Sequence, residues 1–244
     1  MGNRLRTIHD KQAQAAAAAG QLRRGPVRAR PHLGDADKAI ARDELRRILE
    51  HAARLASHEA RRGLRGPRTR DLLLLELLAS TGLRASEAAR LEVRDVVLEG
   101  EPYVRVRGGK KRRPAQVDTV PLTQRLAREL ASWCRGLEPR APLFGHAGDA
   151  AAPIDRRAVW AIVKRYLRAV GARAVLNVHS LRHRFLTDLA SAAGANPFDV
   201  AKLGRLRRMD TVLEYFGASQ TRAAVEALPL PWPARRTAPY RRRK

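Results

Sequence analysis

The sequence is poor in cysteine, in aromatic residues and in acidic side chains. Its 244 residues include one cysteine, Cys134, which excludes a disulfide framework and a cysteine-rich zinc site. We therefore expect a reducing compartment, the cytoplasm or a nucleus. No apolar run approaches the roughly 18–20 residues that span a bilayer, and the N-terminal residues lack the apolar stretch of a secretory signal. These absences predict a protein with no membrane partner.

Acidic residues are scarce relative to basic ones. Lysine and arginine number 49 and aspartate and glutamate 24, so the chain carries a formal net charge of +25 at pH 7. Hydrophobic residues still make up 44% of the chain, which is enough to fill a core and argues against disorder throughout. An excess of positive charge this large favours a polyanionic partner, and we expect a nucleic acid.

Composition divides the chain into three segments. Residues 1–36 form a basic arm that combines an alanine tract with prolines and many arginines. Residues 37–228 carry regular apolar patterns and are expected to form one domain. Residues 229–244 are rich in proline and end in Arg241-Arg242-Arg243-Lys244, which predicts an extended basic tail.

Periodicity within the central segment predicts a mainly α fold with a small antiparallel β-sheet (α+β). Apolar residues recur at helical spacing over most of it, and residues 70–80 are apolar nearly all round, as in a buried helix. The short helix that follows is expected to be capped by Ser86. Tyr103 to Arg107 alternates in polarity, and Gln116 to Val120 offers an antiparallel partner across a basic turn.

Two segments place cationic side chains beside expected helix starts. Arg84 lies in the turn before a helix, where free N–H groups and the helix dipole favour an anion, although a plain surface arginine fits the same pattern. His179 and Arg182 are three residues apart at another helix start, so they project to one side. An imidazole beside a guanidinium can bind one phosphate and move a proton, and a structural histidine is the equal alternative. An arginine neighbour argues against a metal site.

A third segment runs from Leu203-Gly204-Arg205 to Tyr215. A tyrosine close to basic residues is a candidate nucleophile. The same tyrosine shares helical spacing with Val212 and Phe216, so a core position is the alternative.

Taken together, these segments resemble the tyrosine recombinase (phage integrase) family over roughly residues 37–225. The stretch TGLRASEAARL is similar to the family's first arginine motif, and HSLRHRFLTDLA to its His-x-x-Arg motif. Lys110 falls in the hairpin turn where the family has its catalytic lysine, with Lys111 as the alternative, and Val120-Pro121-Leu122 matches the segment after it. Leu203-Gly204 followed by Tyr215 matches the C-terminal motif.

The resemblance implies a site-specific recombinase or integrase that breaks and rejoins double-stranded DNA through a 3′-phosphotyrosyl intermediate, without cofactor, metal or ATP. Tyr215 would attack the phosphate, and His179 would accept or relay its proton. Arg84 and Arg182 would bind the non-bridging oxygens, and Lys110 would protonate the leaving 5′ oxygen.

The sequence departs from the family's pattern in three places. Arg205 stands where members usually have histidine, or sometimes tryptophan; it can donate to a phosphate oxygen but cannot relay a proton. The step from Arg205 to Tyr215 is one residue longer than usual and the usual spacing points to Glu214, which cannot be the nucleophile, so we expect a shifted or bulged helix. About 36 residues precede the domain, too few for the family's N-terminal DNA clamp, and the basic arm is expected to replace it loosely.

The family also recombines DNA as tetramers, so a homo-oligomer on DNA is expected. Ala218 to Leu228 is the candidate segment for docking on a neighbour, with Val225 and Leu228 as anchors, and packing on its own subunit is the alternative. Two other functions remain open. A DNA-binding accessory protein of a mobile element would keep the fold and lose turnover, and a type IB topoisomerase-like enzyme would relax one strand without a partner.

Overall fold

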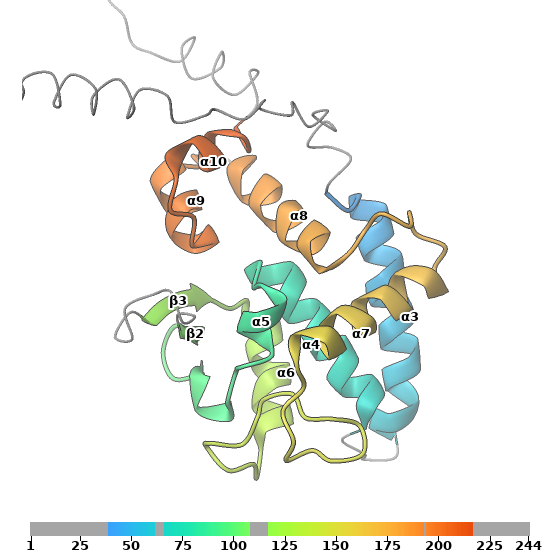
Figure 1. The fold of residues 1–244 in the computed structure, drawn as a ribbon. Helices are drawn as coiled ribbons and strands as arrows, with labels where there is room; N and C mark the ends of the chain where they lie inside the picture. Colours follow the sequence, from blue (N-terminus) through green and yellow to red (C-terminus); the bar gives the residue numbers. More distant parts are fainter. Residues whose placement is uncertain (1–38, 62–65, 108–116, 193, 217–244) are drawn as a thin grey trace, which may run out of the picture. The chain divides into compact units, whose positions relative to one another are not determined.

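The computed structural model describes residues 39–61, 66–107, 117–192 and 194–216. The expected arm and tail, Lys110 and Lys111, and the segment 218–228 lie outside the described residues. The helices are α3 (Arg42–Arg61), α4 (Pro67–Thr81), α5 (Ala85–Ala88), α6 (Gln124–Cys134), α7 (Arg156–Ala169), α8 (Val178–Ala190), α9 (Pro197–Gly204) and α10 (Met209–Leu213). A 3-10 turn, η1 (Val93–Asp95), precedes the strands β1 (Val96–Val97), β2 (Tyr103–Arg107) and β3 (Val117–Pro121). The described part is mainly α with one small antiparallel sheet, which confirms the predicted fold class (Figure 1).

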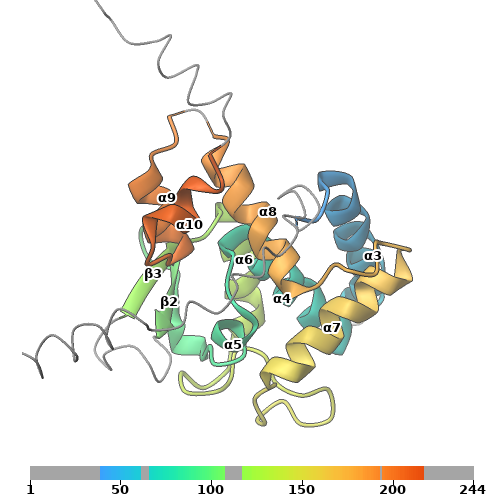
Figure 2. The same cartoon turned by 45° about the horizontal axis from the view of Figure 1, so that its top comes forward.

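Helix α4 is the central element. It packs against α3, α6 and α8 (Figures 1 and 2). A helix covered on several sides needs an apolar surface nearly all round, and this is what the sequence pattern predicted. The leucines that fill this role are no more than 3% exposed: Leu73, Leu74, Leu75, Leu77 and Leu78.

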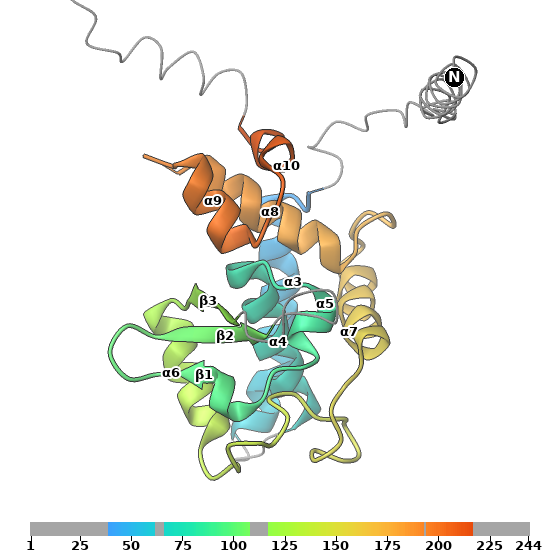
Figure 3. The same cartoon turned by 60° about the vertical axis from the view of Figure 1, so that its left-hand side comes forward.

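The three strands form an antiparallel sheet in the order β1–β2–β3. The register pairs Tyr103 with Pro121 at one end of the hairpin and Arg107 with Val117 at the other, so the predicted strand pair is confirmed. Figure 3 shows β2 between its two neighbours, with α6 alongside them. The two-residue β1 is an addition that the sequence pattern did not reveal.

A buried carboxylate fixes α7 against α4. Asp71 has no exposed surface and accepts hydrogen bonds from Arg70 at 2.7 Å, from Tyr166 of α7 at 3.3 Å and from Arg165 of α7. Arg70 also donates to the Gly145 carbonyl at 2.8 Å. Since a buried carboxylate is costly unless it is paired and hydrogen-bonded, this network holds both helices in one arrangement.

The helix after α4 starts differently from the prediction. Arg84, and not Ser86, is the N-cap of α5, and the Glu87 carboxylate accepts the Arg84 N–H at 2.9 Å. The expectation for Ser86 was therefore wrong. A carboxylate three residues after the N-cap can reach back to the N-cap amide, so a serine there is not needed.

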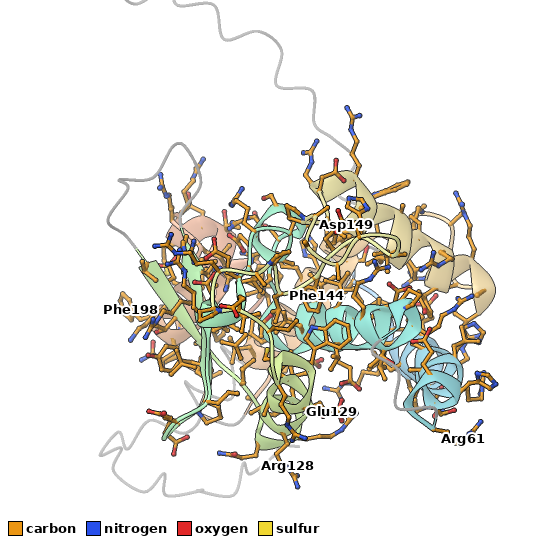
Figure 4. All side chains as sticks on the ribbon, turned by 90° about the horizontal axis from the view of Figure 1, so that it is seen from below. Arg61, Arg128, Glu129, Phe144, Asp149 and Phe198 are labelled. Carbon is orange, nitrogen blue, oxygen red and sulfur yellow. The ribbon has the colours of Figure 1, made fainter. Side chains whose placement is uncertain are left out.

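The apolar interior consists of a large cluster and a small cluster. The large cluster joins α3, α4, α6, α7 and the sheet, and Phe144 lies within it at 1% exposed (Figure 4). The small cluster lies among α8, α9 and α10 and consists of Leu186, Ala190, Val200 and Val212. Phe198 of α9 projects outward at this end and is 70% exposed (Figure 4). Helices α9 and α10 thus depend on a much smaller core than the rest of the domain.

Candidate active site

The turn between α4 and α5 has no room for a side chain at Gly82. Its φ of 57° lies in the left-handed region that favours glycine, and a Cβ atom there would lie 2.4 Å from the Phe185 ring. The carbonyl of Gly82 accepts hydrogen bonds from both Arg182 and Arg205. Segments that are far apart in the sequence therefore meet at this turn.

Arg84 follows that turn and leaves part of its guanidinium open to solvent. Its Nη1 donates to Oε1 of Glu87 at 2.8 Å, and the Arg84 side chain is 41% exposed against 9% for Glu87. Burial alone would raise the pKa of Glu87, but the charges of Arg205 and Arg84 outweigh it and hold that pKa below its usual value. Glu87 is therefore a buried anion that fixes the orientation of Arg84.

Arg182 is buried between two carbonyl groups from distant parts of the chain. It is 3% exposed, its Nη1 donates to Gly82 at 2.6 Å, and its Nη2 donates to Gly204. Burial, and then the charges of Arg84 and Arg205, lower the pKa of Arg182 to about 9. Because this value still lies above neutral pH, Arg182 supplies a fixed and largely desolvated cation.

Arg205 forms the C-cap of α9 in a left-handed conformation, with φ 52°. Its side chain has no exposed surface; Nη2 donates to Gly82 at 2.9 Å and to Oε2 of Glu87 at 3.1 Å, and Nη1 donates to Leu203 at 2.8 Å. Burial lowers the pKa of Arg205, and Glu87 opposes that shift. Among the described residues, its Nε has no hydrogen-bond partner. The guanidinium thus faces Glu87, and the phosphate contact expected for it stays a prediction.

His179 lies in the first turn of α8, where the N-cap Asn177 accepts its N–H at 2.8 Å. The residue is exposed as a whole. Partial desolvation of the ring, and then the charges of Arg182 and Arg84, lower the pKa of His179 from its ordinary value of 6.5. The imidazole is therefore neutral at pH 7 and able to accept a proton.

Tyr215 is half-buried and turned toward α8. Its hydroxyl lies 3.0 Å from Nδ1 of His183, and the two ring centroids are 5.6 Å apart. His183 in turn stands edge-on to His179, with centroids 4.8 Å apart. Tyr215 also lies within electrostatic range of Arg182, since its negative form would raise the pKa of that arginine. The candidate nucleophile is thus close to the arginine site.

Of the two positions that the spacing offers for the nucleophile, Tyr215 and not Glu214 contacts α8. Helix α9 ends at the left-handed Arg205, residues 206–208 cross to α10, and α10 has only five residues. Glu214 is the C-cap of α10 and is exposed. The ten-residue step from Arg205 to Tyr215 thus contains the irregular connection between two short helices.

A cavity of about 410 Å³ brings Arg84, His179 and Arg182 together. Helices α7 and α8 present their N-terminal turns to this cavity, and the N-terminal end of a helix favours an anion. No carboxylate is among the described residues that line it. Sequence reasoning missed three lining residues from the first two turns of α7: Arg156, Arg157 and Trp160. The available signal was the pair of arginines directly after Asp155, which caps that helix.

The described residues contain no group of three or more histidine, cysteine, aspartate or glutamate residues placed to hold a metal ion. None of the helices described here is long and apolar enough to cross a membrane.

Comparison with known proteins gives a family. The Phage integrase family model matches residues 38–222. A tyrosine recombinase of Synechococcus elongatus is 32% identical over 166 residues, which cover 62% of this chain and 48% of the relative. The tyrosine recombinase XerC of Xanthomonas campestris pv. campestris is 32% identical over 187 residues, covering 76% of this chain and 51% of the relative. The chain thus spans about half the length of these relatives.

Solved structures show the same fold. The XerA recombinase superposes with a TM-score of 0.59 at 20% identity, over 80% of this chain and 66% of that one. The XerH recombinase bound to a palindromic difH substrate superposes with a TM-score of 0.60 at 22% identity, over 78% of this chain and 52% of that one. Because the family match extends over most of the sequence and includes both arginine motifs, the chain belongs to the phage integrase family of tyrosine recombinases.

Proposed function

We propose that the protein is a site-specific DNA recombinase or integrase that breaks and rejoins double-stranded DNA through a 3′-phosphotyrosyl intermediate. The observation that carries the proposal is the cavity that Arg84, His179 and Arg182 line without a carboxylate. A phosphodiester bound there would have its developing negative charge met by fixed cationic donors. Membership of the family and the net charge of +25 both favour DNA as the substrate.

In the proposed reaction the Tyr215 oxygen bonds to phosphorus as the bond to the 5′ oxygen breaks. One phosphoester replaces another, so the bond energy is retained and the step needs neither ATP nor a metal ion. Arg84 and Arg182 bind the non-bridging oxygens, Lys110 protonates the leaving 5′ oxygen, and His179 moves protons at the site. The 5′ hydroxyl of a partner strand then attacks the phosphotyrosine and reseals the DNA.

Arg205 has a supporting role in this proposal. Its buried pair with Glu87 fixes the carboxylate that orients Arg84, so Arg205 acts on the phosphate through its neighbours. Arg205 also favours a second candidate function, a DNA-binding accessory protein of a mobile element. It replaces the histidine that family members usually carry at this position, and its side chain is buried against Glu87. On DNA we propose a tetramer in which residues 218–228 dock on a neighbouring subunit.

Trapping of a covalent intermediate tests the proposal. The protein is incubated with nicked suicide duplexes that tile the DNA on either side of its own gene, and covalent protein–DNA adducts are separated under denaturing conditions. We expect an adduct that Tyr215→Phe abolishes and that Tyr103→Phe, a half-buried tyrosine of β2, retains. Normal DNA binding without any adduct supports the accessory protein. Relaxation of supercoiled plasmid without exchanged product supports a topoisomerase.

A further inference from the structure

His183 lies within hydrogen-bond distance of the candidate nucleophile, and none of the roles assigned above is given to it. Its Nδ1 lies 3.0 Å from the Tyr215 hydroxyl, which is an ordinary hydrogen-bond distance. We propose that His183 is the general base that takes the Tyr215 proton when the tyrosine attacks DNA, an inference that rests on the proposed recombinase function.

Helix geometry explains why His183 lies close to both Tyr215 and the cavity. His179 and His183 are four residues apart on α8, so their side chains lie on one face, and the rings meet edge-on at 4.8 Å and 88°. His179 lines the cavity. His183 is half-buried and stands between that ring and Tyr215. The hydroxyl, the base and the expected phosphate site therefore follow one another along one helix face.

Packing holds the tyrosine against His183. Tyr215 rests on the small cluster of Leu186, Ala190, Val200 and Val212, and Leu186 and Ala190 belong to the same helix as His183. The positive charge of Arg182 lies within electrostatic range of the phenol. A nearby cation stabilises the phenolate that forms as the proton leaves, so Arg182 and His183 favour the same change at Tyr215.

The proposed step balances in atoms and charge. The step requires a neutral His183 with its hydrogen on Nε2, which accepts the Tyr215 proton on Nδ1. The phenol oxygen forms its bond to phosphorus, the bond from phosphorus to the 5′ oxygen breaks, and that oxygen takes a proton from the general acid of the proposed mechanism. When the strand is resealed, the imidazolium returns its proton to the departing tyrosine. His179 is then left to act at the phosphate itself.

The test measures the rate of adduct formation in a single turnover on the suicide duplex that gives the wild-type adduct. We expect His183→Ala to slow the step by roughly 100-fold or more while DNA binding is kept, and added imidazole to restore part of the rate. His183→Asn retains an acceptor oxygen near the position of Nδ1 but cannot take up a proton at neutral pH, so it should be as slow as His183→Ala. His58→Ala, an exposed histidine of α3, is the matched control and should match wild type.

Three results overturn the proposal. A rate for His183→Ala within about threefold of wild type removes His183 from the reaction. Recovery by His183→Asn shows a hydrogen bond that only positions Tyr215. If His183→Ala unfolds, ¹⁵N NMR of the imidazole in the wild-type protein gives the decision. A hydrogen on Nδ1 of His183 would rule out its role as general base. An unprotonated Nδ1 whose chemical shift changes in Tyr215→Phe would support that role. Absence of an adduct from the wild type is a different failure, because it overturns the recombinase function and takes this inference with it.

Discussion

The two sides of the candidate site differ in how firmly the fold holds them. The Gly82 turn and the first turns of α8 rest on the large apolar cluster, to which Leu83 and Leu181 belong. Arg205 and Tyr215 lie on α9, α10 and their connection, which share the small cluster. From the roles proposed above, we call the Gly82 turn with the first turns of α8 the phosphate side, and α9, α10 and their connection the nucleophile side. The first is continuous with the main core, and the second has little apolar area of its own.

Buried arginines join the two sides. Arg182 donates to Gly82 on the phosphate side and to Gly204 on the nucleophile side, and Arg205 donates from the nucleophile side to Gly82 and Glu87. Polar links of this kind are strong only while every partner is in place. The comparison therefore teaches that the nucleophile side depends on buried charged groups in addition to its small apolar cluster, whereas the phosphate side is also continuous with the main core.

Removal of Arg182 should have the largest effect, because it breaks the link and the phosphate contact together. We expect Arg182→Ala to slow adduct formation by about 1000-fold, in line with the loss of a fixed donor to a developing oxyanion. It should also lower the free energy of unfolding by about 1–3 kcal/mol, since the buried Gly204 carbonyl loses its arginine donor and the Gly82 carbonyl keeps only that of Arg205. Adduct trapping and urea unfolding measure the two effects. The control is Arg184→Ala, whose guanidinium pairs with Asp188 and does not line the cavity; an equal loss there would contradict the assignment.

A matched pair of leucine substitutions separates the two sides. Leu77 in the large cluster and Leu186 in the small one are both 0% exposed. Leu77→Ala should lower the global free energy of unfolding by about 3 kcal/mol. Leu186→Ala should speed amide hydrogen exchange in residues 197–215 while costing less globally, because the nucleophile side can open by itself. Equal exchange throughout the domain in both variants would mean that the two sides unfold as one unit.

Arg205→His restores the residue that family members usually have and removes the pair with Glu87. If Arg205 acts by positioning, the variant should form adduct about tenfold more slowly, since the histidine cannot reach the Gly82 carbonyl and Glu87 together. Arg208→His is the control, as Arg208 is exposed and pairs with Asp210 at the surface. A faster Arg205→His enzyme would instead show that the position contacts phosphate directly.

Sequence periodicity was sufficient for the parts of the fold that local pattern determines. The buried α4 and the β2–β3 hairpin follow from apolar spacing over a few turns or strand residues, and the family motifs indicated Arg84, His179 and Arg182 as partners. Local pattern failed where a contact depends on tertiary packing. The pair of Arg205 with Glu87 joins residues 118 positions apart.

The same limit applies to the nucleophile and to the cavity wall. The hydrogen bond from Tyr215 to His183 spans 32 positions, and no spacing rule singles out one histidine of the motif over the other. In the sequence, Arg156 and Arg157 are typical of an exposed, charged first turn of a helix. Only the packing of α7 against α4 through Asp71 brings them to the cavity wall. Their role at the site could be found only once the helices were placed.

The smallest expected effect is that of acid, which should weaken the hydrogen bonds between the two sides by protonating Glu87. One oxygen of this carboxylate accepts from Arg84 and the other from Arg205, and their charges lower its pKa from the ordinary 4.5 despite burial. A carboxyl group with a lowered pKa in the folded state binds protons more readily when unfolded. Its contribution to stability is therefore complete above about pH 4.5 and is lost as the pH falls through the lowered value.

Glu87→Gln should be less stable than wild type at pH 7, and the difference should shrink as the pH falls below 4.5, measured by thermal unfolding at each pH. A constant difference would mean that Glu87 contributes by packing and not by charge, and the link between the two sides would then rest on the hydrogen bonds of Arg182 and Arg205 to backbone carbonyls.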